Sequence, residues 1–141
     1  MLYNQKDKLD LSILITLSRS TQMIQRRSAA ILKDSGLTIT QFGVLEALYH
    51  KGDMTINEII ERLLSTSGNM TVVINNLEKE QLINRYVNPK DRRSALIAIT
   101  EKGCSRVEAI FPPHLQDLKE NFSVYSEDEK EQLLDLLKKL R

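Results

Sequence analysis

The sequence has 141 residues, with 20 lysines and arginines against 19 acidic residues and a single cysteine. This length suits one domain whose core needs no metal or disulfide framework, and the near balance of charge excludes a generally polybasic protein. Cys104 has no partner for an internal disulfide, and no stretch has the pattern of a secretion signal or the roughly 20 apolar residues of a membrane span, so we expect a cytoplasmic protein.

Apolar spacing predicts a long helix followed by a short amphipathic one. The first covers residues 9–32, where apolar side chains recur on one side, and Gly36 ends it. The second is expected to begin near Thr40, as its N-cap, and to end at Gly52. Its apolar side would consist of Phe42, Leu45, Leu48 and Tyr49.

Two further helices are expected in close succession. Thr55 and Glu58 have the spacing of a capping box, which predicts a helix over residues 55–63. The next helix is predicted over residues 66–81, with an inward face formed by Met70, Val73, Ile74 and Leu77. Its outward face would carry short and largely uncharged side chains, namely Ser67, Thr71, Val72 and Asn75.

After Leu82 the pattern becomes that of extended strands. Residues 83–87 and 94–99 are rich in β-branched and aromatic side chains, which favour strands. Residues 88–93, between them, are turn-forming and basic. We therefore expect a β-hairpin whose tip carries Lys90, Arg92 and Arg93.

The remainder of the chain is expected to be helical. Thr100 would cap a helix that runs to Phe111, where Pro112-Pro113 must kink or restart it because proline removes backbone donors. Ser126 and Glu129 repeat the capping-box spacing and start a last amphipathic helix, whose apolar stripe is Leu133, Leu136, Leu137 and Leu140. The predicted order is thus four helices, one hairpin and two further helical segments.

The paired helices 55–63 and 66–81 have the order of a helix-turn-helix, in which the second helix presents its polar face to a DNA major groove. Asparagine can pair with adenine, and threonine and valine methyls can pack on thymine. Base contacts are therefore expected from Asn69, Thr71, Val72 and Asn75, of which Asn75 has an ordinary surface residue as its alternative reading. Phosphate contacts at the helix start are expected from Ser65, Thr66 and Ser67, where Gly68 lets the backbone come close.

The basic hairpin tip suits a DNA minor groove. Arginines on a narrow projection are attracted to the negative potential of a groove narrowed by A·T pairs. Only one of Arg92 and Arg93 needs to enter it, and Arg93 is the favoured one. Asp91 is expected to orient one of the two guanidinium groups, and Lys90 adds a further positive charge.

The chain resembles the MarR family of winged-helix regulators, over nearly its full length. The resemblance runs from Thr40-Gln41-Phe42-Gly43-Val44-Leu45 through the hairpin to Leu96-Ile97-Ala98-Ile99-Thr100-Glu101-Lys102-Gly103. Its most specific part is the wing pattern, which appears here as Asp91, Arg93, Ile99, Thr100 and Gly103. Isoleucine at position 99, where the family has leucine, is a mild departure.

This resemblance implies a mainly α fold with a small β-hairpin wing, a single domain over residues 1–141. Residues 37–100 would form the winged helix-turn-helix, and residues 1–36 and 101–141 would supply long dimerisation helices. The implied function is that of a homodimer on palindromic double-stranded DNA, commonly a repressor that a phenolic or other aromatic compound releases. Residues 64–73 further resemble a subgroup that includes quinone- and catechol-responsive regulators.

One departure from the family concerns charge on the recognition helix. Val72 and Asn76 stand where many members have arginines. Fewer cationic contacts imply a shallower dependence of DNA affinity on salt, and they leave more of the electrostatic attraction to the wing. The same departure favours A·T-rich half-sites.

Other readings of the sequence stay open. A winged helix that acts through protein contacts without DNA is one, although it would fit a neutralised wing better. Cys104, near Lys102 and Arg106, could act as an oxidant sensor, against the plainer reading of a small helix residue. His50 and His114 are too isolated for a metal site, no cofactor or catalytic motif occurs, and no ligand-pocket residue can be assigned. The apolar terminal stripes fit either a closed monomer core or a two-fold interface.

Overall fold

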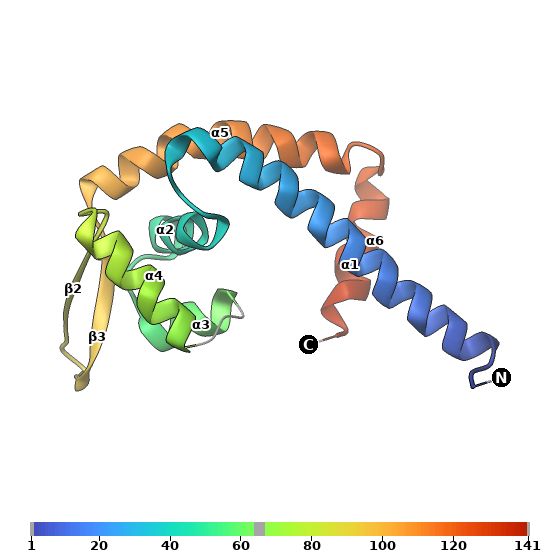
Figure 1. Cartoon of the computed structure of the whole chain (residues 1–141), viewed down its shortest axis with the longest axis horizontal. Coiled ribbons are helices and arrows are strands. Elements are labelled where there is room, and N and C mark those ends of the chain that lie inside the picture. Colours follow the sequence, from blue (N-terminus) through green and yellow to red (C-terminus); the bar gives the residue numbers. More distant parts are fainter. Residues whose placement is uncertain (1, 64–66, 141) are drawn as a thin grey trace. The chain divides into compact units, whose positions relative to one another are not determined.

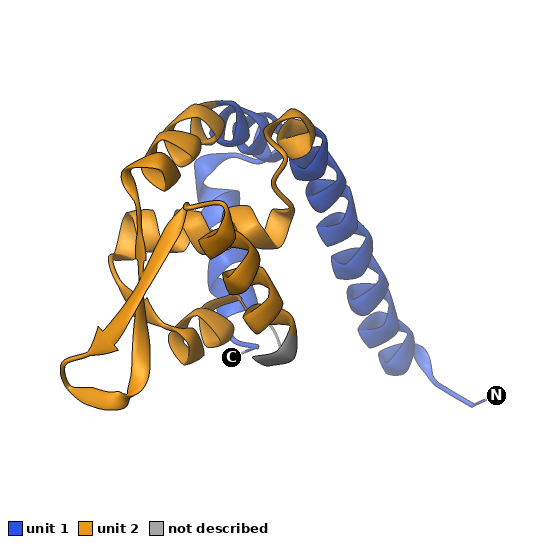
Figure 2. Ribbon diagram, turned by 60° about the vertical axis from the view of Figure 1, so that its left-hand side comes forward, with its two compact units in different colours: residues 1–30, 113–141 blue, residues 31–112 orange. Residues whose placement is uncertain are grey.

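The computed structural model describes residues 2–63 and 67–140, which form helices and a small antiparallel sheet (Figure 1). Two compact units are present, Ile31–Pro112 and a second built from Met1–Ala30 with Pro113–Arg141 (Figure 2). The elements are α1 (Gln5–Leu32), a 3-10 turn η1 (Lys33–Ser35), α2 (Ile39–Lys51), β1 (Met54–Thr55), α3 (Ile56–Leu63), α4 (Ser67–Lys79), β2 (Ile83–Asn88), β3 (Asp91–Ile99), α5 (Glu101–Phe122) and α6 (Glu127–Lys138). This is the predicted winged-helix class. None of the described helices combines the length and apolarity needed to cross a membrane.

The core of the Ile31–Pro112 unit lies between α2, α3, α4 and the sheet. The predicted inward face of α4 is confirmed, because Met70, Ile74 and Leu77 are fully buried and Val73 nearly so. Ile59 of α3 and Ile97 of β3 are fully buried in the same cluster. Each such side chain removed from water stabilises the fold by about 1.5–3 kcal/mol, so this packing fixes the position of α4.

The sheet has three strands in the order β1-β3-β2, one more than the hairpin predicted from the sequence. The additional strand, β1, pairs Met54 with Ile97 and Thr55 with Leu96. Two residues are too few to show an alternating pattern, which is why the sequence did not reveal it. Thr55 also caps α3 as predicted, since its Oγ1 accepts a hydrogen bond of 3.1 Å from the backbone N–H of Glu58.

The wing differs from the prediction at its tip. β3 begins at Asp91 instead of residue 94, because Asn88 pairs with Asp91 across a two-residue turn. The Asn88 side chain accepts a hydrogen bond of 3.0 Å from the backbone N–H of Lys90, which tightens this turn. Arg92 and Arg93 consequently lie on a strand, in the stretch of β3 where its register with β2 shifts between Val87 and Asn88.

The start of α2 also corrects the sequence prediction. The N-cap is Thr38 and not Thr40, and Thr38 forms a capping box in which it exchanges hydrogen bonds with Gln41. Thr40 lies inside the helix. Glutamine at the third helical position satisfies the N-cap amide as glutamate would, and this signal was present in the sequence.

We expect Thr38→Ala to lower the free energy of unfolding by about 1 kcal/mol, because it removes the cap of α2. Thr40→Ala is the matched control, since it places a better helix former inside the same helix and is expected to change stability little. Chemical denaturation of both variants measures the difference. A larger loss in Thr40→Ala than in Thr38→Ala would contradict this assignment of the cap.

The sequence predicts that the two prolines of α5 kink or restart the helix, and the structure shows no restart. α5 is continuous from Glu101 to Phe122, although Pro112 and Pro113 remove the donors for two carbonyl groups one turn earlier. Those carbonyl groups belong to Glu108 and Ala109, which are exposed, so water can satisfy them. The capping box of α6 is confirmed, with Ser126 and Glu129 exchanging hydrogen bonds.

Candidate nucleic-acid interface

The face of α4 opposite the core is exposed and polar. Asn69, Thr71 and Asn75 are exposed, and Val72 keeps 58% of its surface accessible. Ser67 opens the helix, whereas the predicted phosphate contacts Ser65 and Thr66 lie outside the described residues. The four predicted base-contact residues therefore share one accessible helix surface, and Asn76, next to them, is also exposed.

A contact between the wing and α4 was not expected from the sequence. Arg85 of β2 donates from Nη2 to Oδ1 of Asn75 at 2.7 Å and from Nε to Oε2 of Glu78 at 3.1 Å. A signal for it existed, because Asn75 and Glu78 are three residues apart and share a helix face. Finding it needed the strand register, which places Arg85 opposite the buried Ile97 and hence on the face of the sheet toward α4.

The wing tip presents its positive charge to solvent. Lys90, Arg92 and Arg93 are all exposed, and the Arg93 side chain keeps 93% of its surface accessible. Asp91 Oδ1 accepts hydrogen bonds from the backbone N–H and the Nε of Arg93, at 3.1 and 3.3 Å. Arg93 is thus the arginine that Asp91 contacts.

The base of the wing is tied to both of its neighbours. Tyr86 of β2 donates a hydrogen bond to Asp53, and this bond raises the pKa of the Tyr86 phenol above its ordinary value. Thr100 Oγ1 donates to the Gln81 carbonyl at 2.8 Å and accepts from the Gly103 N–H at 3.0 Å. These bonds fix the wing and the end of α4 against the start of α5.

Gly103 permits this close packing. A Cβ at this position would lie 2.6 Å from Cγ1 of Ile99 and still closer to the carbonyl oxygen of Leu82. Lys102 adds a bond of 2.9 Å from Nζ to the carbonyl of Glu80. The sequence pattern Ile99-Thr100-x-x-Gly103 is therefore the junction at which α5, α4 and β2 meet.

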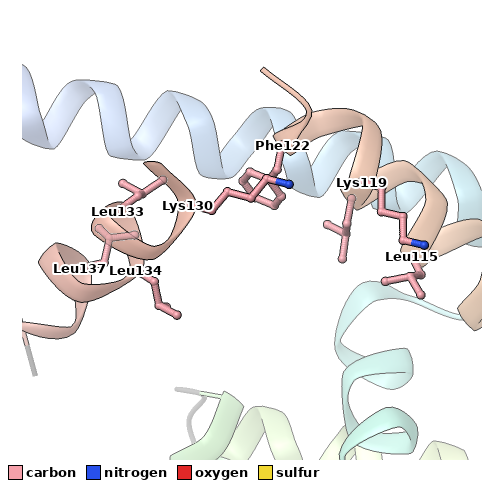
Figure 3. A pocket seen from close by; sticks show the side chains of 8 residues that line it. Leu115, Lys119, Phe122, Lys130, Leu133, Leu134 and Leu137 are labelled. Carbon is pink, nitrogen blue, oxygen red and sulfur yellow. The ribbon is translucent and has the colours of Figure 1, made fainter. Parts of the chain in front are cut away.

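The second compact unit carries an apolar surface. A groove of about 360 Å³ lies between the second half of α5 and α6 (Figure 3). Its polar lining residues are Lys119 and Lys130. Within the same unit, Arg27 of α1 pairs with Asp117 of α5 at 2.6 Å. Along α1 the side chains of Leu9, Ile13 and Leu14 keep half or more of their surface accessible. The apolar lining of the groove is Leu115, Leu118, Phe122, Leu133, Leu134 and Leu137.

The structure also shows the surroundings of the histidine and cysteine residues considered above as metal ligands or as an oxidant sensor. Among the described residues, no group of three or more histidine, cysteine, aspartate or glutamate side chains is placed to hold a metal ion. The His50 ring packs against Tyr49 and Phe111, with centroids 5.1 Å apart in both cases. The Tyr49 hydroxyl donates to Glu108 at 3.1 Å, which raises its pKa. Cys104 is half-buried in the first turn of α5.

Comparison with known proteins identifies relatives along nearly the whole chain. The model of the MarR family matches residues 37–95. The transcriptional regulator MhqR of Bacillus subtilis is 39% identical over 130 residues, which cover 92% of this chain and 90% of that protein. A mutant of MarR from E. coli, solved with operator DNA, has a TM-score of 0.81 and 26% identity over 98% of this chain and 99% of its own. Bordetella bronchiseptica BpsR, whose DNA binding is regulated by 6-hydroxynicotinic acid, has a TM-score of 0.82 and 25% identity over 99% and 97%.

Proposed function

The chain belongs to the MarR family and is a DNA-binding transcriptional regulator, and we propose that it is a homodimeric repressor released from a palindromic operator by a small aromatic compound. The observation that carries the proposal is that the same lobe has an exposed polar face on α4 and an exposed wing arginine, Arg93, which contacts Asp91. Neither feature contributes to the core. Both have the chemistry that duplex DNA recognition requires.

In this proposal α4 enters the major groove and the wing reaches the adjacent minor groove. The exposed face of α4 supports base contacts from Asn69, Thr71, Val72 and Asn75, and Arg93 supports the wing contact. Lys90 and Arg92 add attraction to phosphates. Ser65, Thr66 and Ser67 are proposed as phosphate contacts from the sequence alone.

The dimer is proposed to form through the terminal helices. Leu9, Ile13 and Leu14 of α1 and Leu136 of α6 are exposed apolar side chains on elements outside the DNA-binding lobe. Exposed apolar surface of this kind marks an interaction site, and a two-fold interface would bury the same stripe of both copies. Two recognition helices would then stand about one DNA turn, ~34 Å, apart.

We expect light scattering of the full-length chain to give twice the mass of one chain at micromolar concentration. Footprinting on its operator should show two symmetric protected half-sites whose centres are about 10 base pairs apart. A monomer in solution that protects a single half-site would contradict the dimeric proposal. It would leave DNA binding by the lobe intact.

The effector is proposed to be a small phenolic or quinone-like compound. The regulation of BpsR by a hydroxylated aromatic acid supports this class, as does the likeness of residues 64–73 to quinone- and catechol-responsive regulators. Titration of the protein–operator complex with hydroquinones, catechols and hydroxybenzoates measures release. No release by any compound that binds the protein would contradict ligand-relieved repression.

The two alternatives have weaker support than DNA binding. The first alternative is a winged helix that acts through protein contacts and does not bind DNA. Such a wing would not need three exposed cationic side chains, which here are Lys90, Arg92 and Arg93. A sensor thiol needs accessibility, and Cys104 is half-buried. Curated relatives are named as transcriptional regulators, which favours a protein without enzymatic activity.

A further inference from the structure

The guanidinium of Arg85 links the wing strand β2 to the recognition helix. It donates to Asn75 at 2.7 Å and to Glu78 at 3.1 Å, and only a third of the Arg85 side-chain surface is accessible. The planar fork of arginine suits two acceptors at fixed positions, whereas a lysine ammonium would meet them as a single point charge. Arg85 thus bridges two side chains of one helix face.

This contact decides which end of the Asn75 amide faces the wing. A guanidinium has donors and no acceptor, so it can bond only to the amide oxygen. One lone pair of Oδ1 is used by Arg85, and the N–H₂ end of the same amide is left as the donor part of the side chain. Without Arg85 the amide could rotate by half a turn and present oxygen where it now presents nitrogen.

We propose that Arg85 is a positioning residue for sequence recognition, which holds Asn75 so that it donates a hydrogen bond to an acceptor on a base edge. This inference rests on the proposed placement of α4 in the major groove. Acceptors there are O6 and N7 of guanine, N7 of adenine and O4 of thymine. The bidentate adenine pair expected from the sequence needs Oδ1 as an acceptor of the base amino group, and Arg85 competes for that oxygen.

The positive charge of Arg85 is paired with a carboxylate of the protein itself. Glu78 pairs with it at 3.1 Å and is on the same helix, so the net charge of this contact is close to zero. Arg93 differs, because its side chain is almost fully accessible. Neutralisation by phosphate, which makes DNA affinity salt-dependent, therefore falls to Arg93 and not to Arg85.

The test compares base preference with salt dependence in full-length variants. Wild type, Asn75→Ala, Arg85→Ala, Arg85→Lys and the Asn75→Ala/Arg85→Ala double variant are each selected on a random duplex pool, and their affinity for the wild-type operator is measured over a range of salt. Thermal unfolding checks that each variant is folded. Arg85→Lys keeps the charge and informs the test even if Arg85→Ala does not fold.

We expect Asn75→Ala and both Arg85 variants to relax the preference at the same operator position. Each should weaken operator binding about fivefold per half-site, the size of one lost hydrogen bond, with an unchanged salt slope. Arg85→Ala should add nothing in the Asn75→Ala background.

Three results would overturn the inference: a salt slope that falls by about 0.9 per lost contact with all sequences weakened equally, full base preference in Arg85→Lys, or unchanged preference in Asn75→Ala. In all three cases wild type would still select an operator. If wild type itself selects none, the proposed function fails instead.

Discussion

Replacing Gly103 by alanine is expected to lower the free energy of unfolding of the Ile31–Pro112 unit by about 3 kcal/mol, at the upper end of overpacking effects. The new Cβ would overlap the Leu82 carbonyl oxygen and lie 2.6 Å from Ile99 Cγ1. Backbone cannot move aside as a flexible side chain can. Alanine's better helix propensity, worth about 1 kcal/mol, offsets only part of this cost.

Ser105→Ala is the matched control for Gly103→Ala. Ser105 lies two residues further along α5 and is exposed, so the same new residue in the same turn should leave stability within about 0.5 kcal/mol of wild type. Denaturant unfolding followed by circular dichroism measures both. Equal stability of wild type and Gly103→Ala would mean that α5 does not pack on Leu82 as described.

Arg93→Ala should weaken operator binding about tenfold and make the dependence of affinity on salt shallower by about 0.9 per lost phosphate-equivalent contact. The reason is that the Arg93 guanidinium is exposed, contacts Asp91 and lies on the wing that is proposed to enter the minor groove. In a dimer both copies lose the contact. Fluorescence anisotropy at several salt concentrations measures the affinity and the slope together.

Arg92→Ala is the matched control for Arg93→Ala, because it removes the same charge one residue away. Asp91 contacts the side chain of Arg93, and the proposal needs only one of the two arginines to enter the groove. We expect the smaller loss from Arg92→Ala. A slope unchanged by Arg93→Ala, or equal losses from both variants, would show that the wing acts only as a diffuse positive charge.

Much of the fold could be predicted from the sequence wherever a periodic apolar pattern was long and capping or turn residues marked its ends. The inward face of α4 is such a case, since four apolar residues at helical spacing were all placed in the core. The wing strands and the Ser126 cap of α6 are others. In each, local propensity and tertiary packing agree.

The errors came from features that depend on partners distant in the sequence. β1 is strand only because β3 lies beside it. The turn at Asn88 is short because its side chain bonds to Lys90, which moved Arg92 and Arg93 from a loop onto a strand. α5 continues through two prolines without a restart, and the residues whose carbonyl groups lose their donors, Glu108 and Ala109, are exposed, which a rule about proline alone does not weigh.

The exposure of the candidate residues on α4 and the wing and the contact of Asp91 with an arginine were predicted from the sequence, but the contact of Arg85 with α4 was not. The exposed side chains of α4 and the wing were found from face and charge. Arg85 was missed because, in the sequence, it is one polar residue of a strand without a clear alternating pattern, and only the β2–β3 register places it toward Asn75 and Glu78. The exposed residues of an interface are thus easier to predict from sequence than the residues that hold them in position.

Selection of the full-length chain on a random duplex pool, followed by sequencing of the bound fraction, tests the central claim most directly. DNA recognition by α4 and the wing predicts enrichment of a palindrome whose A·T-rich half-sites are centred about one helical turn apart. Absence of any enriched sequence at moderate salt would contradict sequence-specific DNA binding by this chain and would favour a winged helix that acts through protein contacts.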